Sequence, residues 1–172
     1  NVNSNSAIVV QVGKKDFGSN VFDGMNYQIQ MEKLAYTLGG GNYLAPSMLV
    51  GDYLTGKISS SFGKVQPSYD RGVTKADLNK LFSNDINNSI KYAITDMGKR
   101  LKGFDMYDGV LTGVESRTSS PIKITRNENL VSLSANNLYP CGEGCGYAGG
   151  ITSASIDGIK VAESIIENIT NN

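Results

Sequence analysis

The feature that most constrains this chain is a glycine-dense turn between a short apolar segment and a long helical pattern. Five of the 20 glycines fall within the nine residues from Gly142 to Gly150. Apolar residues before the turn predict a strand over residues 137–141, and those after it predict a helix from Ile151 to about Ile169. Glycine lets a ligand approach the main chain closely, and a helix start carries N–H donors and a partial positive charge. The turn therefore favours an anion or a polarised carbonyl oxygen.

The same turn satisfies the pattern G-x-G-x-x-G from Gly144 to Gly149. A dinucleotide-binding fold also needs a second strand after the helix, with an acidic residue about 20 positions on. The predicted helix reaches nearly to Asn172, so we expect no such strand within these 172 residues. We expect the unit to complete a nucleotide fold whose other strands come from elsewhere. The alternative, a tight turn whose glycines serve packing only, stays open.

The rest of the chain predicts a mixed α/β (α+β) fold with a helix-rich N-terminal portion. Thr74 and Asp77 match a capping box. The expected elements are a buried strand at 7–12, a helix at 23–38, an ordered loop with short local elements at 42–69, two helices between 77 and 101 that break near Ser83, and strands at 110–114 and 122–124. On the last helix, the residues expected to face inward are Ile151, Ala154, Ser155, Gly158, Ile159, Ala162, Ile165, Ile166 and Ile169.

Composition excludes several kinds of chemistry. The chain has no histidine, so it cannot by itself supply a Ser-His-Asp triad, a Cys-His pair, a histidine-ligated zinc or a histidine base. Sixteen basic residues balance sixteen acidic ones, which gives no argument for nucleic acid as a partner. No apolar run is long enough for a membrane span, and the start resembles no signal peptide, so we expect a cytoplasmic protein without a membrane partner.

One cysteine directly precedes the glycine turn and a second lies within it. Cys141 and Cys145 are spaced C-x3-C, whereas redox pairs more often use C-x-x-C. A zinc site would need two further ligands. Packing as small residues is therefore favoured over a redox or metal role, and we expect no metal site.

Several motifs taken together resemble a known family. They cover nearly the whole chain: LGGGNY at 38–43, VGDYL at 50–54, QPSY at 66–69, LTGVESRTSSP at 111–121, LYPCGEG at 138–144, GYAGGI at 146–151 and DGIKVAE at 157–163. This combination resembles the C-terminal half of the bacterial family of uncharacterised FAD-dependent dehydrogenases, in the two-dinucleotide-fold flavoprotein superfamily. The combination is far more specific than a single glycine pattern.

The resemblance implies that two parts of the chain have different roles. Residues 1–108 would be mostly a substrate or cap portion, and residues 109–172 would be the segment that returns to the FAD-binding domain. The family's first FAD-binding unit lies near the N-terminus of a much longer protein, and nothing in this sequence matches it. The implied parent is an FAD-dependent oxidoreductase that moves hydride or electrons to or from a small-molecule substrate. We expect this piece to need the missing FAD-binding portion as its partner, and not to hold FAD alone.

The resemblance also assigns cofactor-binding residues. Gly142 and Glu143 would form a Gly-acidic motif whose carboxylate binds the ribityl chain, although an exposed loop carboxylate is the alternative for Glu143. The following helix would direct its start at the flavin. The full implied set is Gly142, Glu143, Gly144, Gly149, Gly150, Ile151 and Thr152. Cys145 departs from the family, which commonly has alanine at this position.

Outside the turn, a few polar residues are weaker candidates. Arg117 lies among serines and threonines and could hold a substrate carboxylate or the flavin edge, or form an ordinary turn with a salt bridge to Glu115. Arg126 is expected at the surface, and Asp52 and Tyr53 could line a substrate cleft. No residue is nominated as a catalytic acid or base. Two other classes of function stay open: a non-catalytic phosphate- or nucleotide-binding module, and a structural or interaction domain.

Overall fold

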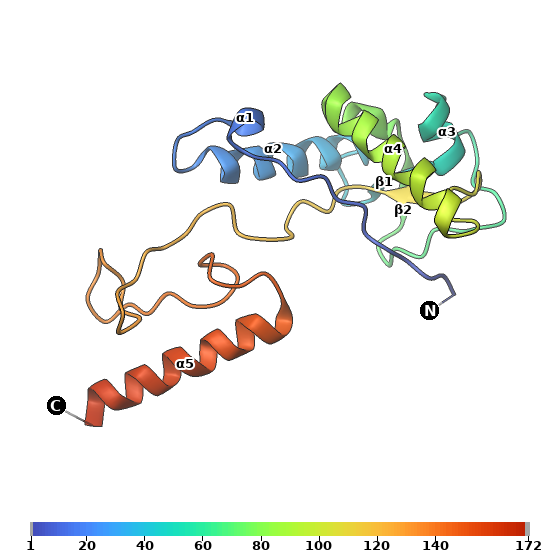
Figure 1. The fold of residues 1–172 in the computed structure, drawn as a ribbon. Helices are drawn as coiled ribbons and strands as arrows, with labels where there is room; N and C mark the ends of the chain where they lie inside the picture. The colour runs from blue at the N-terminus through green and yellow to red at the C-terminus, as the bar shows by residue number, and fades with distance from the viewer. Residues whose placement is uncertain (1, 171–172) are drawn as a thin grey trace. The chain divides into compact units, whose positions relative to one another are not determined.

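A computed structural model describes residues 2–170 and confirms a mixed α/β fold (Figure 1). The chain forms two compact units. The first combines residues 1–12 with 28–116, and the second combines 13–27 with 117–172. Each is described separately below.

The first unit is built on a small sheet in the order β2-β1-β3. The central strand β1 (Ala45–Leu49) pairs in parallel with β2 (Val73–Lys75) and antiparallel with β3 (Val110–Thr112). Four of its five residues are buried, as expected for a strand with a neighbour on each edge. β1 runs directly into a short helix, α3 (Val50–Thr55). This strand-to-helix junction is therefore at the centre of the unit.

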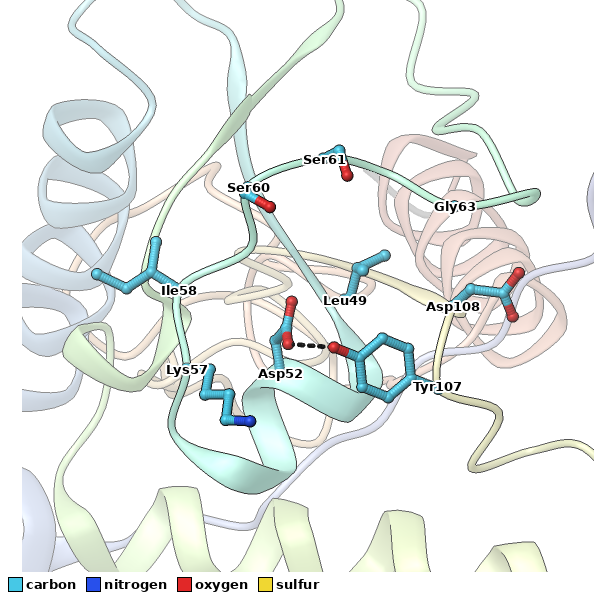
Figure 2. A pocket seen from close by; sticks show the side chains of 9 residues that line it. All are labelled: Leu49, Asp52, Lys57, Ile58, Ser60, Ser61, Gly63, Tyr107 and Asp108. Atoms are coloured by element: carbon cyan, nitrogen blue, oxygen red, sulfur yellow. Dashed lines mark hydrogen bonds between the residues drawn. The ribbon is translucent and has the colours of Figure 1, made fainter.

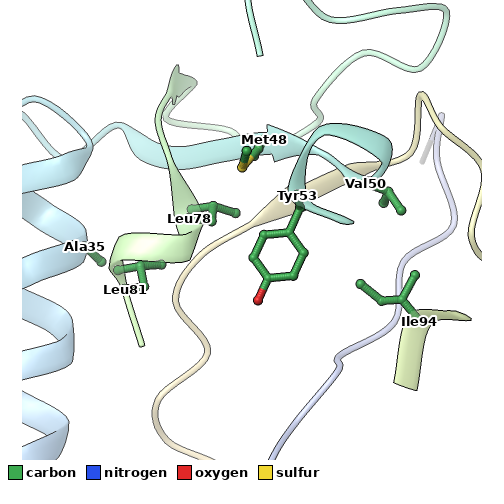
Figure 3. Close-up of a cluster of buried hydrophobic side chains, with 7 residues drawn as sticks. All are labelled: Ala35, Met48, Val50, Tyr53, Leu78, Leu81 and Ile94. Atoms are coloured by element: carbon green, nitrogen blue, oxygen red, sulfur yellow. The ribbon is translucent and has the colours of Figure 1, made fainter. Parts of the chain in front are cut away.

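Helical segments complete the core of the first unit. They are the part of α2 (Asp23–Leu38) from residue 28 onward, the 3-10 turn η1 (Leu78–Lys80) and α4 (Asn84–Arg100). Ser83 accepts a hydrogen bond from the amide of Ile86 and so caps α4, which confirms the predicted helix break. The buried cluster, shown in Figure 3, consists of Ala35, Met48, Val50, Tyr53, Leu78, Leu81 and Ile94.

One buried polar residue links the helical segments. The Asn87 side chain accepts a hydrogen bond from the Tyr53 hydroxyl at 2.8 Å and donates to the carbonyls of Asn79 and Phe82 at 2.7 and 3.0 Å. Burial, with a smaller contribution from Asp77, raises the pKa of Tyr53 to about 12, so its hydroxyl stays protonated and donates. The hydrogen bonds of the Asn87 side chain thus connect α4 with α3 and with η1.

The second unit has little regular structure besides its last helix. It contains the single turn α1 (Lys14–Phe17) and the 20-residue α5 (Ile151–Thr170). Between residues 117 and 150 the chain is mostly turns, with one isolated bridge between Arg126 and Ser132. Ser164 donates a hydrogen bond to the Asn129 carbonyl, so this irregular segment packs against one face of α5, where Val161 is buried. None of the helices described in residues 2–170 is long and apolar enough to cross a membrane.

Several predicted elements are wrong. Strands were expected at 7–12, 122–124 and 137–141. The structure describes all of these residues and forms no strand at any of them. Ile8 instead packs half-buried against the core of the first unit without joining the sheet. The capping box is also wrong, since Thr74 lies in β2 and Asp77 alone caps η1 through the amide of Asn79. The loop expected at 42–69 contains β1 and α3, so its local elements are more central than predicted.

The inward face predicted for α5 is largely wrong. Ile151, Ile159, Ile166 and Ile169 are all exposed, whereas Ala154, Gly158 and Ile165 are partly buried. The polar residues Asp157, Ser164 and Asn168 share the covered face because they hydrogen-bond to the irregular segment. The helix therefore has a packed face, and its exposed surface carries both these isoleucines and charged residues such as Glu163.

The predicted division into residues 1–108 and 109–172 stays a prediction about function. In the structure, β3 (Val110–Thr112) belongs to the sheet of the first unit, and residues 117–172 to the second unit.

The Asn87 network generates a stability prediction. Asn87→Ala removes three hydrogen bonds and leaves the Tyr53 hydroxyl without its acceptor, so we expect the free energy of unfolding to fall by about 2–3 kcal/mol. Asn88→Ala is the matched control, because Asn88 follows Asn87 on the same helix and is exposed. Urea unfolding monitored by circular dichroism measures both. Equal midpoints for the two variants would show that the network does not stabilise the fold.

Candidate functional site: the glycine turn and the start of α5

The glycine turn is closed by its own backbone. The amide of Gly146 donates to the Glu143 carbonyl at 2.9 Å, and the amide of Tyr147 donates to the Gly142 carbonyl at 3.0 Å. Gly142 and Gly146 have φ values of +71° and +80°, a conformation that favours glycine. A side chain at Gly146 would also place its Cβ 2.6 Å from the Ile122 carbonyl oxygen. At these two positions the glycines are required by the turn itself.

An ion pair fixes the turn to the helix. The Arg126 guanidinium donates to both carboxylate oxygens of Asp157 on α5, at 2.6 and 3.0 Å, and also to the Pro140 carbonyl at 2.7 Å. One Asp157 oxygen also accepts the amide of Gly142 at 2.8 Å. Arg126 therefore connects the residue before the turn with the helix after it. Bidentate geometry of this kind is specific to arginine.

The ion pair is well shielded from water. The two side chains are 10% and 13% exposed. The hydrogen bonds from Arg126, together with the Gly142 amide, lower the pKa of Asp157 although partial burial opposes them. The bonds to Asp157 likewise raise the pKa of Arg126. Both groups are charged at neutral pH, so the turn is held by a permanent charge pair.

Tyr147 supports this arrangement from the other side. Its ring lies under the Arg126 guanidinium, with the centroid 3.7 Å from the guanidinium carbon, and the Lys123 ammonium is 4.4 Å from the same centroid. Its hydroxyl accepts from the Arg126 amide at 3.1 Å and donates to the Ile124 carbonyl at 3.0 Å. Tyr147 thus has a structural role, holding residues 123–126 against the turn.

The expectation that Arg126 is a surface residue is wrong, because its guanidinium is buried between Tyr147 and Asp157. Arg126 and Asp157 are 31 positions apart, and no periodic pattern links them. The sequence signal for this pair is weak: Asp157 appears only as part of the family-like motif at 157–163.

The start of α5 is open to solvent. The first helical bond runs from the Ala154 amide to the Gly150 carbonyl at 2.9 Å, so Gly150 stands at the cap position. The neighbouring residues Gly149, Ile151 and Thr152 are exposed, and a Cβ built at Gly149 or Gly144 would meet no atom within 4 Å. The main chain here is accessible to a ligand, and the helix start supplies N–H donors without intrahelical acceptors.

The predicted cofactor-binding residues therefore gather on one continuous stretch. Glu143 and Gly144 are exposed on the turn, and Gly142 is held by Asp157. Open N–H groups at a helix start suit carbonyl oxygens, and an exposed carboxylate such as that of Glu143 can accept hydrogen bonds from hydroxyl groups. The isoalloxazine and ribityl parts of FAD together carry these groups.

Arg117 is exposed in the segment that leads to the turn. Three residues later, Ser120 donates a hydrogen bond to the Gly144 carbonyl at 3.1 Å, so this segment contacts the turn. The contribution of Arg117 to a site stays a prediction. Cys141 is exposed and Cys145 is half-buried, and both are free thiols. In the first unit, Tyr53 belongs to the core, whereas Asp52 lines a pocket.

The Arg126–Asp157 pair generates a pH-dependent prediction. Asp157→Asn retains the shape but removes the charge, so we expect the free energy of unfolding at neutral pH to fall by about 2 kcal/mol. The pKa of Asp157 is lowered in the folded state, so its stabilisation is present above the ordinary carboxyl pKa and disappears as the pH falls through the folded value. The difference between wild type and variant should therefore shrink in acid.

Denaturant unfolding at neutral pH and at a series of lower pH values measures this difference. Glu163→Gln, an exposed carboxylate on the same helix, is the control and should change little at any pH. A difference for Asp157→Asn that is constant across the series would contradict the assigned charge pair.

Comparison with known proteins shows which family the chain belongs to. Residues 1–118 match the family described as FAD-dependent protein, C-terminal domain-like. An uncharacterised protein of Clostridium beijerinckii is 47% identical over 166 residues, which cover 96% of this chain and 31% of that protein. The chain thus spans about a third of the length of this relative. On the family match and this identity, the chain belongs to the FAD-dependent protein, C-terminal domain-like family.

Proposed function

We propose that this chain is the C-terminal portion of an FAD-dependent oxidoreductase and that its glycine turn and α5 start contact the flavin. The observation that carries the proposal is the open main chain at Gly149, at the start of a helix that the Arg126–Asp157 pair ties to the beginning of the turn. The family match supports FAD as the ligand. The flavin would supply the hydride or electron transfer to a small-molecule substrate.

The roles of the chain's own residues follow from their chemistry. The amides of Ile151 and Thr152, at the start of a 20-residue helix, would stabilise negative charge on a ring oxygen through hydrogen bonds and the helix dipole. The Glu143 carboxylate would accept a hydrogen bond from a ribityl hydroxyl. Gly144 and Gly149 would allow the ring system to approach the backbone, since no atom occupies that space. Arg117 remains a candidate for the flavin edge or a substrate carboxylate.

We further propose that the partner of α5 is the FAD-binding portion of a longer protein. Ile151, Ile159, Ile166 and Ile169 are 59–90% exposed, and at helical spacing they cover roughly a quarter of the helix circumference. A contiguous apolar face of this kind marks an interaction surface. The relative's greater length is consistent with further chain to cover it. A cytoplasmic location and dehydrogenase activity are part of the same proposal.

The first test uses a substitution that blocks approach to the backbone. In the full-length protein, Gly149→Val should reduce the amount of FAD that copurifies at least tenfold, because the added side chain occupies space that is open in the chain itself. Glu143→Ala should also reduce it, since one hydrogen bond to a charged group is worth about 1.5–3 kcal/mol, or roughly 10- to 150-fold in affinity. FAD is quantified by absorbance after denaturation.

Gly13→Val is the matched control, because a Cβ at Gly13 also meets no atom within 4 Å and its φ is −148°. It should leave the FAD content unchanged. Normal FAD content in Gly149→Val would exclude the turn from the flavin site. If phosphate or a nucleotide other than FAD raises the melting temperature while FAD does not, the module is a phosphate-binding one.

The second test addresses the apolar face of α5. Ile166→Ser in the full-length protein should lower the free energy of unfolding by about 1–3 kcal/mol if the side chain is covered there. Ile and Ser have similar helix propensities, so an uncovered Ile166 predicts a change within about 0.5 kcal/mol. Glu163→Ser on the polar face is the control. A change no larger than that of the control would contradict the proposed partner.

A further inference from the structure

The two ends of β1, the central strand of the first unit, differ in what they offer to a partner. Beyond the carboxyl end, the pocket beside α3 is lined by Asp52 and Tyr107, whose side chains hydrogen-bond to each other at 2.6 Å (Figure 2). Ser59 donates a second hydrogen bond to Asp52 at 2.7 Å, so this buried carboxylate has its partners within the chain. At the amino end, by contrast, two tyrosines and an arginine are exposed together.

The segments that precede the two parallel strands bring these three residues together. The loop before β1 carries Tyr43 and the turn before β2 carries Arg71, and the amide of Ala45 joins them by donating to the Gly72 carbonyl at 3.1 Å. The Arg71 guanidinium carbon is 5.9 Å from the centroid of the Tyr43 ring. Tyr36, near the end of α2, makes a T-shaped contact with the same ring, 5.0 Å between centroids. We call the side chains of Tyr36, Tyr43 and Arg71 the Tyr43 surface.

The loop that carries Tyr43 is tied to the elements around it. The Tyr36 hydroxyl donates to the Gly41 carbonyl, and the Thr74 hydroxyl of β2 donates to the Gly39 carbonyl at 2.9 Å. Tyr43 itself has a φ of +64°, a left-handed conformation that is uncommon for a residue with a bulky side chain. Such a conformation persists only where the surrounding contacts determine it, and it is enriched at functional sites. Here it occurs at the residue whose ring is exposed.

The Tyr43 surface has the composition of a protein interface. Tyr43 is 67% exposed and Tyr36 is 41% exposed. Arg71 is exposed as well, and within residues 2–170 its guanidinium has no ion-pair partner. Tyrosine and arginine are enriched where proteins bind each other, because a rigid ring covers apolar area and a guanidinium binds carboxylates. The surface therefore suits a partner that offers apolar side chains and a carboxylate.

The place of the Tyr43 surface argues for a protein partner. In sheets with parallel strands, small ligands bind beyond the carboxyl ends of the strands, and in concave sites. The Tyr43 surface lies at the amino ends of β1 and β2, and its two rings are exposed. Exposed rings beside a guanidinium suit another protein surface better than a small molecule.

We propose that the Tyr43 surface docks against the FAD-binding portion of the longer protein, with a carboxylate of that portion at Arg71 and apolar side chains on the Tyr43 ring. This rests on the proposed function, which gives the remaining chain an FAD-binding role. The amount of chain supports this occupant, because about two thirds of the relative lies outside the matched 31%. The contact belongs to the first unit, whereas α5 belongs to the second.

Tyrosine footprinting on the full-length protein tests this contact. Tyr92 on α4 is the matched reference, because it is 71% exposed in the same unit. We expect tetranitromethane to nitrate Tyr43 at least tenfold more slowly than Tyr92, as measured by mass spectrometry of peptides. Equal rates at the two tyrosines would overturn the proposal. Protection of Tyr43 that disappears on dilution would assign the surface to a second copy and would also overturn it.

A charge reversal tests the carboxylate expected at Arg71. Arg71→Glu in the full-length protein should speed the nitration of Tyr43 at least threefold, because the variant repels the partner's carboxylate. Lys64→Glu, which reverses an exposed cation elsewhere in the same unit, is the control and should leave that rate unchanged. Melting temperatures of both variants identify any loss of fold. Full protection of Tyr43 in a folded Arg71→Glu variant would contradict the assigned carboxylate.

The FAD content of the same samples separates this proposal from the flavin contact. A protein that holds FAD but nitrates Tyr43 as fast as Tyr92 contradicts the docking alone. A protein that protects Tyr43 but binds no FAD contradicts the flavin site alone, since the remaining chain still covers the Tyr43 surface.

Discussion

The bidentate pair between Arg126 and Asp157 is the interaction on which the proposed flavin contact depends. A glycine-rich turn loses more conformational entropy on folding than any other kind of segment. Here the chain offsets that cost with a shielded ion pair that also binds the amide of Gly142 and the carbonyl of Pro140. The beginning of the glycine turn is therefore bound directly to α5. A lysine in place of Arg126 would supply the charge without the fork that spans both partners.

Glycine has two different roles in this chain. At the start of α5, a ligand would meet main-chain donors and a helix dipole, and Gly149 matters because it leaves space. At the junction of β1 and α3, Gly51 matters because the Tyr107 ring fills the space that a side chain would need.

The sequence alone predicted the parts of the fold that local rules govern. The helix at 23–38, the last helix from 151 to about 169 and the helix break near Ser83 follow from apolar spacing and from residues that start and stop helices. The central strand was missed as such because Pro46 lies within it, and proline normally argues against a central strand. In the structure Pro46 still contributes its carbonyl, which accepts the Gly113 amide at 3.0 Å. The buried face of α5 was mistaken because Asp157 and its neighbours form specific hydrogen bonds, which hydrophobic periodicity does not detect. Likewise the glycine turn was recognisable, but Arg126 and the Asp52–Tyr107 pair join segments far apart in the sequence.

The central claim is that the longer protein carrying this chain binds FAD. The most direct measurement is the visible absorption spectrum of that protein as purified, followed by its melting temperature with and without added FAD. We predict a yellow protein with a two-banded flavin spectrum, whose melting temperature falls when the flavin is removed and recovers when FAD is returned. A colourless protein that gains no thermal stability from FAD would contradict the account.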